Sequence, residues 1–200
     1  MSAPPPVAAG NSLINRVKAI VVQPATEWQT IAGEPATVGS IYTGYIAILA
    51  AIPAICGAVW RGRDFGGSGV RFAIVTYILL GLLFPFVMAL IIDALATSFG
   101  GTKNQVQALK VSAYASTPYW VVGILYLIPG TWLIDLARLL GGLYSLYLLY
   151  LGLPVLMKAP ADRAVGYTVV TVCLAIVAYA IIGVAIGGAL LGGSVYPSYR

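Results

Sequence analysis

Long apolar stretches recur along the chain, and polar residues gather in the short connections between them. A helix needs about 20 mostly apolar residues to cross a bilayer, because each residue adds about 1.5 Å and the hydrocarbon layer is about 30 Å thick. We therefore predict an all-α integral membrane bundle with five transmembrane helices in residues 35–193. The expected helices cover residues 40–60, 71–99, 111–129, 132–153 and 165–191, and short flexible tails are expected at 1–11 and 194–200.

The connections between these helices are short and contain residues that interrupt helices. Residues 62–70 (GRDFGGSGV) are rich in glycine and carry charges, so we expect a loop there. In residues 128–131, proline and glycine end one helix and Thr131 can cap the next. The polar residues 100–107 and 158–163 make the remaining connections.

Residues 12–34 predict a short amphipathic helical segment before the first span. Apolar side chains recur on one face of a helix here, with Arg16 assigned to the other face, and Pro24 suits the start of a second helix. We expect the segment to lie in the inner membrane–water interface, with Trp28 as its aromatic anchor. The alternative is a surface helix packed against the loops.

Composition supports a membrane protein and excludes several kinds of chemistry. Of 200 residues, 60% are hydrophobic and 8% are charged, whereas soluble domains carry about 25% charged residues. Histidine is absent, which excludes a Ser-His-Asp triad, a histidine general base and histidine metal ligands. Since the sequence also has no phosphate-binding loop or metal-ligand cluster, we predict no catalytic residue, no cofactor and no metal. The net charge of +5 is spread over loops, which does not favour nucleic-acid binding.

Basic residues predict the orientation, because lysine and arginine favour the cytoplasmic side of a membrane. With a cytoplasmic N-terminus, the inner segments contain more basic residues than the outer ones. The inner basic residues are Arg16, Lys18, Lys103, Lys110, Lys158 and Arg163, and the outer ones are Arg61, Arg63, Arg71 and Arg200. We therefore expect the N-terminus inside and the C-terminus outside.

Three ionisable residues lie within the expected spans, each near an interface. Asp93 follows the start of its span by about 33 Å of helix, so it lies near the inner surface. It is either an ion or proton site or an interfacial carboxylate near Lys103 or Lys110, and its depth favours the carboxylate. Asp135 and Arg138 share a helix face near the outer surface. They form either a clamp for a lipid headgroup or substrate, or a structural ion pair.

Two polar groups of side chains occur in the third and fourth spans. Tyr144 and Tyr147 either line a groove for a lipid or prenyl chain or pack between helices. Pro118 removes a helical hydrogen bond, and the hydroxyls of Ser116 and Thr117 can bond the backbone that it frees. This polar patch is either a fixed kink or a hinge.

Small residues in the last span allow close helix packing. Gly183 with Gly187, and Gly188 with Gly192, form two GxxxG patterns. They serve either packing within the bundle or contact with a second copy. The two cysteines lie at different expected depths, so we predict no disulfide between them.

Several stretches together resemble the Yip family of Ypt-interacting membrane proteins, specifically its short bacterial members. The resemblance covers about residues 12–190 and rests on the order and spacing of residues 24–28 (PATEW), 112–118 (SAYASTP) and 144–153 (YSLYLLYLGL). It implies five spans, a cytoplasmic N-terminus and an external C-terminus. Eukaryotic relatives are linked to Rab-type GTPases and membrane trafficking. This sequence lacks their long cytosolic region and their Asp-Leu-Tyr-Gly-Pro motif, so we do not expect GTPase binding to transfer.

The pattern and the resemblance favour a non-enzymatic protein of a bacterial inner membrane. It is expected to act in membrane organisation or trafficking-like scaffolding, through contacts with membrane lipids and with other membrane proteins or itself. The alternatives are a small accessory subunit of a larger membrane complex and a small transporter or channel. The few ionisable side chains within the expected spans argue against transport.

Overall fold

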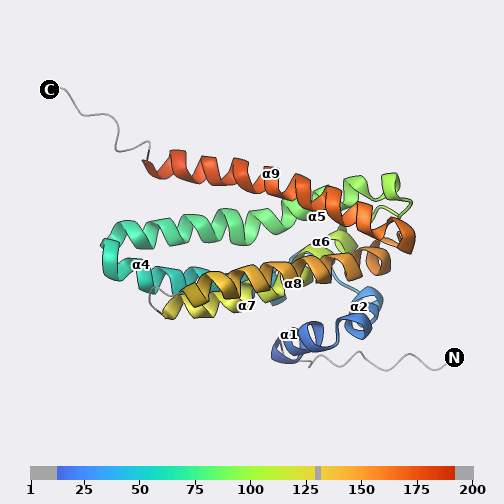
Figure 1. Ribbon diagram of the computed structural model, residues 1–200, viewed down its shortest axis with the longest axis horizontal. Helices are drawn as coiled ribbons and strands as arrows, with labels where there is room; N and C mark the ends of the chain where they lie inside the picture. The colour runs from blue at the N-terminus through green and yellow to red at the C-terminus, as the bar shows by residue number, and fades with distance from the viewer. Residues whose placement is uncertain (1–12, 129–131, 192–200) are drawn as a thin grey trace.

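The structure is a computed structural model that describes residues 13–128 and 132–191, and the described part is built from helices (Figure 1). The α-helices are α1 (Leu13–Val22), α2 (Pro24–Gly33), α3 (Val38–Ile41), α4 (Ala47–Thr76), α5 (Phe84–Leu95), α6 (Gln105–Ala115), α7 (Thr117–Val122), α8 (Trp132–Met157) and α9 (Ala164–Leu191). Wider π-helical turns form η1 (Tyr42–Ile46) and η2 (Tyr77–Leu83), and 3-10 turns form η3 (Thr97–Phe99), η4 (Gly123–Leu127) and η5 (Ala161–Arg163). The expected tails, and most of the expected turn at 128–131, lie outside the described residues.

Four helical stretches of the described chain are long and apolar enough to cross a membrane. They are Val38–Val59, Val70–Leu95, Trp132–Met157 and Ala161–Ala185, and they correspond to the expected first, second, fourth and fifth spans. The long helices run side by side along one axis, and α1 and α2 lie along one edge of the bundle (Figure 1). The all-α membrane class is therefore confirmed, with four candidate spans.

The expected third span, residues 111–129, is not one long helix. The chain breaks at Ser116, between α6 and α7, and continues as the 3-10 turns of η4. Pro118 has no N–H to offer the carbonyl of Tyr114, and the Thr117 hydroxyl donates a hydrogen bond to that carbonyl at 2.7 Å instead. The predicted kink is present, with a hydroxyl bonded to the freed backbone, and the segment consists of two short helices and 3-10 turns, so it is not among the four candidate spans.

Neighbouring helices hold this break in place. The hydroxyl oxygens of Tyr45 and Thr117 are 2.6 Å apart. Because Thr117 already donates its proton to Tyr114, Tyr45 is the donor in this pair. On the other side, the Ser112 hydroxyl donates to the carbonyl of Pro85 at 2.8 Å. These buried bonds to two other helical segments favour a fixed kink over a hinge.

Residues 62–70, which we expected to form a loop, are helical. They belong to α4, and the chain reverses direction there at the end of the bundle far from α2 (Figure 1). Glycine weakens a helix by about 1 kcal/mol per residue, but unlike proline it keeps its hydrogen-bond donor. The segment contains glycine and no proline, so its composition is compatible with helical turns. The reversal lies where we expected it, and only its backbone conformation differs.

Small residues set two close helix crossings. A Cβ added at Gly123 would lie 2.5 Å from the Cβ of Pro53, so η4 can approach α4 only with glycine at this position. A Cβ added at Gly81 would lie 3.1 Å from the Cβ of Ala50. These contacts bring η4 and η2 against α4 and define the inner walls of the bundle.

Candidate functional site

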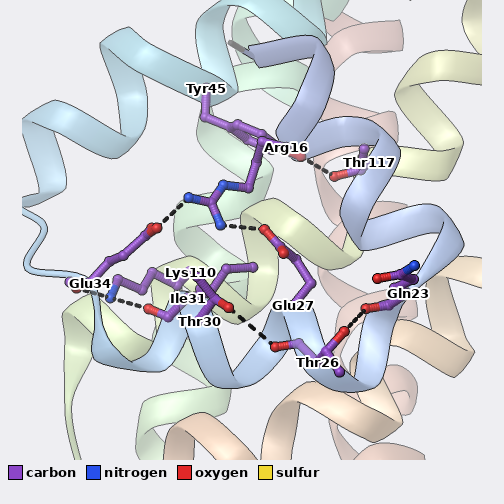
Figure 2. A network of polar contacts seen from close by, with 10 residues as sticks. All are labelled: Arg16, Gln23, Thr26, Glu27, Thr30, Ile31, Glu34, Tyr45, Lys110 and Thr117. Carbon is purple, nitrogen blue, oxygen red and sulfur yellow. Dashed lines mark hydrogen bonds and ion pairs between the residues drawn. The ribbon is translucent and has the colours of Figure 1, made fainter. Parts of the chain in front are cut away.

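Four charged residues join α1, α2 and α6, and we call them the N-terminal clamp: Arg16, Glu27, Glu34 and Lys110 (Figure 2). Arg16 of α1 forms ion pairs with Glu27 of α2 and with Glu34, the residue that follows α2. The Arg16 side chain is 11% exposed, and the carboxylates are 13% and 25% exposed. One largely buried guanidinium therefore links α1 to the first turn of α2 and to the residue that follows its last turn.

Lys110 of α6 caps the C-terminal end of α2. Its ammonium donates hydrogen bonds to the carbonyls of Ile31, at 2.8 Å, and Glu34, at 2.6 Å. The last carbonyls of a helix have no partner within the helix and carry a partial negative charge, which a cation stabilises. Gln107 adds a bond to the carbonyl of Ala32 at 3.2 Å. Together these bonds attach α2 to the membrane bundle.

Burial and neighbouring charges shift the pKa values of the two cations in opposite directions. Burial lowers the pKa of Arg16, but the hydrogen bond to Glu34 and the charges of Glu34 and Glu27 raise it, and the net shift is upward. Arg16 therefore stays charged, and its contribution is lost only above the ordinary arginine pKa. Burial lowers the pKa of Lys110, and Glu34 only partly opposes this shift. The contribution of Lys110 to the free energy of unfolding therefore rises as the pH increases toward the ordinary lysine pKa.

Trp28, which we expected to anchor the segment in lipid, lies in the protein core. Its side chain is 0% exposed. A Cβ at Gly152 of α8 would lie 2.8 Å from the indole ring, so the ring packs directly on the backbone of α8. The indole also makes a T-shaped contact with the ring of Tyr114, with 6.3 Å between ring centroids. In this structure Trp28 anchors α2 to the bundle, and its ring has no surface free to contact lipid.

The two candidate tyrosines of α8 contact each other and the end of α1. The Tyr144 hydroxyl donates to the carbonyl of Val21 at 2.6 Å. The rings of Tyr144 and Tyr147 are 5.6 Å apart between centroids, and Tyr147 is 47% exposed. Neither tyrosine lines the main cavity of the described chain. The Tyr144 hydroxyl therefore links α8 to α1, as the alternative of packing between helices predicted.

A large lateral cavity lies between α4, η2, α5, α7, α8 and α9, with a volume of about 1100 Å³. Its walls are mostly apolar, and Asp135 and Arg138 border one end. Their charged atoms are 3.8 Å apart, so the predicted ion pair is present. Arg138 also lies over the ring of Tyr126, 5.5 Å from its centroid.

Asp93 lies outside the walls of this cavity. It is half-buried, and one of its carboxylate oxygens is buried without a hydrogen-bond partner. The carbonyl of the preceding residue, Ile92, accepts a hydrogen bond from the Tyr167 hydroxyl. Lys110, one of the lysines expected near Asp93, is engaged with α2 instead. Within residues 13–128 and 132–191, no group of three or more metal-binding side chains comes together.

The glycines of the last span are only partly described. Gly183 of α9 borders the lateral cavity, and a Cβ added there would have no heavy atom within 4 Å. It therefore makes no close packing contact with the part of the chain that the structure describes. Gly187 and Gly188 also belong to α9, and Gly192 lies outside the described residues. Cys56 and Cys173 are free thiols, as predicted.

Sequence reasoning missed the N-terminal clamp. The sequence pattern places Arg16 off the apolar face of the first helix and Lys103 or Lys110 near Asp93, and 94 positions separate Arg16 from Lys110, so no local motif joins them. One signal was present: residues three and four apart share a helix face, which places Arg16 beside Leu13 and Ile20 on the apolar face of α1. A charged residue on a buried face requires a partner. This corrects our assignment of Arg16 to the opposite face.

A helical bundle with four membrane-length apolar helices defines an integral membrane protein. The model of the Yip1 domain family matches residues 18–185, and the chain belongs to this family, as its resemblance indicated. Inner membrane protein YohC of Escherichia coli strain K12 and that of Escherichia coli O6:H1 strain CFT073 are similar to it. Each is 26% identical over 174 residues, covering 82% of this chain and 89% of the relative. No solved structure matches the chain.

Proposed function

We propose that this Yip1-domain protein organises a bacterial inner membrane without catalysing a reaction. It acts through lipid contacts of its N-terminal cap (α1 and α2) and through contacts with other membrane proteins. The observation that carries the proposal is the outward face of α1, where Ile14, Val21 and Val22 are 76%, 36% and 64% exposed. Lys18 is exposed on the same face. Apolar side chains beside a lysine are typical of a helix that lies in a membrane interface.

The N-terminal clamp supports this placement of α1. Glu34 stands four positions before Val38, where the first candidate span begins, so the clamp lies beside one end of the bundle. Charged groups are costly within hydrocarbon, which favours a position at the membrane boundary. Because Arg16 and Lys110 fix α1 and α2 to the bundle, the apolar face of α1 is held outward at that boundary.

We infer that the broken segment from Val111 of α6 through α7 and η4 supplies a fifth crossing, with the N-terminus in the cytoplasm and the C-terminus outside. The segment runs along α8 toward the end of the bundle where α8 begins (Figure 1). Its hydroxyl groups bond the backbone at the break, as a non-helical site inside a membrane requires. The inner membrane location is carried over from the YohC relatives.

An accessory subunit of a larger membrane complex is a second candidate. α9 favours it, because Ile176, Ile181 and Val184 are 63%, 65% and 76% exposed along one membrane-length helix. A row of exposed apolar side chains of this kind suits contact with either lipid or a neighbouring membrane helix. Stoichiometric co-purification with a larger complex in mild detergent supports this candidate, and recovery of the chain without such a complex opposes it.

The proposed function predicts an effect on membrane shape. In vesicles reconstituted with the full chain at equal density, we expect the wild type to reduce the mean vesicle diameter, because α1 inserts into one leaflet. The variant Ile14→Gln/Val22→Gln keeps the clamp and removes the apolar face, so its vesicles should approach the diameter of protein-free vesicles. Gln29→Ala, an exposed change on α2, is the matched control. Equal diameters for wild type and the double variant, measured by cryo-electron microscopy, contradict the proposal.

A further inference from the structure

The lateral cavity has the size and shape of a site for a long apolar ligand. Along α8 it extends from Trp132 to Leu149, which is about 26 Å of helix. Its volume of about 1100 Å³ exceeds the roughly 300–1,000 Å³ of ordinary small-molecule pockets. Phe84, Met88 and Leu146 are among the apolar side chains that form its walls. A ligand that fills this space therefore has a long hydrocarbon part.

One end of the cavity carries a positive and a negative charge side by side. Arg138 and Asp135 make a single contact of 3.8 Å, and their side chains are 45% and 83% exposed. Tyr126 lies against one face of the guanidinium, and Tyr119 also lines the cavity. Arginine has five N–H donors and a carboxylate has about four acceptor sites. Most of the donors of Arg138 and most of the acceptor sites of Asp135 are therefore available to a ligand that carries both an anionic and a cationic group.

An unpartnered hydroxyl also borders the cavity. The Thr76 hydroxyl borders the cavity and is buried without a hydrogen-bond partner. Thr76 belongs to α4 and Arg138 to α8, so the two side chains border the cavity from different helices. A buried hydroxyl is costly unless it finds an acceptor or donor, and an oxygen of a ligand in the cavity supplies an acceptor.

We propose that the lateral cavity binds a glycerophospholipid with a primary ammonium headgroup. Its phosphate binds Arg138, its ammonium binds Asp135, an ester oxygen accepts a hydrogen bond from Thr76, and an acyl chain lies along the cavity toward Leu149. This goes beyond the proposed function, because the site involves neither the N-terminal cap nor its clamp. In the orientation proposed above, the lipid comes from the outer leaflet.

Competition between lipids tests the headgroup assignment. The full chain, released from nanodiscs that contain equal amounts of phosphatidylethanolamine, phosphatidylcholine and phosphatidylglycerol, is examined by native mass spectrometry. We expect the ethanolamine lipid to be retained about tenfold more than the other two, because only it offers N–H donors to Asp135. Asp135→Asn should remove this preference, and Arg138→Gln should weaken retention of all three lipids. Equal retention by the wild type, or a preference unchanged in both variants, overturns the proposal.

Two further comparisons separate a lipid site from a general loss of structure. Gly142 borders the cavity and Gly44 does not, and a Cβ added at either would have no heavy atom within 4 Å. We therefore expect Gly142→Phe to fill the cavity and abolish retention, whereas Gly44→Phe retains lipid. Retention by Gly142→Phe, or loss in Gly44→Phe, contradicts the site. Asp135→Asn should leave the vesicle diameter unchanged, so failure here and failure of the proposed function are distinguishable.

Discussion

Replacing Arg16 by methionine is expected to lower the free energy of unfolding by about 3–5 kcal/mol, because it leaves two largely buried carboxylates without a cation. Glu27 and Glu34 are 13% and 25% exposed and share this one guanidinium. The loss should concentrate in α1 and α2, which Arg16 joins. Denaturant titration in mixed micelles measures the free energy, and hydrogen exchange of the backbone amides of α1 and α2 locates the opening.

A rescue variant distinguishes lost pairing from lost packing. Arg16→Met combined with Glu27→Gln and Glu34→Gln removes all the unpaired charge, and most of the stability should return. Lys18→Met changes a neighbouring exposed residue of α1, and its effect should stay within about 0.5 kcal/mol. If Arg16→Met and Lys18→Met lower the free energy of unfolding equally, the N-terminal clamp does not stabilise the packing of α1 and α2.

Replacing Trp28 by alanine is expected to cost about 3–5 kcal/mol, as for other large buried aromatic side chains. The ring is 0% exposed and packs on the backbone of α8 at Gly152. Trp132, at the start of α8, is 77% exposed and provides the matched control. Its replacement by alanine should change the free energy of unfolding by about 0.5 kcal/mol or less.

Comparing the two tryptophan variants shows whether Trp28 of the cap lies in the protein core or in the membrane interface. If Trp28 packs in the core, Trp28→Ala is far more destabilising than Trp132→Ala in the same micelle titration. If Trp28 instead sits in lipid, as an interfacial anchor does, the two variants should differ little, and the packing of α2 on α8 is contradicted.

The membrane helices could be predicted because their signal is local. About 20 consecutive apolar residues suffice to recognise a span, and four of the expected five match candidate spans. The third expected span is not among them, because the chain breaks at Ser116, and the extent of a break next to a proline such as Pro118 depends on its surroundings. Its sequence shows a possible kink, but the bonds of Thr117 with Tyr45 and Tyr114 that complete the break come from the fold.

The clamp and the place of Trp28 could not be predicted because both depend on contacts far apart in the chain. Arg16 meets Glu34 and shares its environment with Lys110, and Trp28 meets Gly152. A tryptophan beside a predicted span is equally compatible with an interface and a core. The ion pair of Asp135 and Arg138 was predictable, because a spacing of three places two residues on one helix face.

The clamped cap, with the outward face of α1 in the inner membrane interface, is the central claim. Its most direct test is the depth of Ile14, using Ile14→Cys in a Cys56→Ser/Cys173→Ser background, labelled with an environment-sensitive fluorophore and reconstituted in brominated lipid. Gln29→Cys, on the exposed polar side of α2, is the control. We predict strong quenching at position 14 by bromine near the headgroups and weak quenching at position 29. Equal, weak quenching at both positions would contradict the claim.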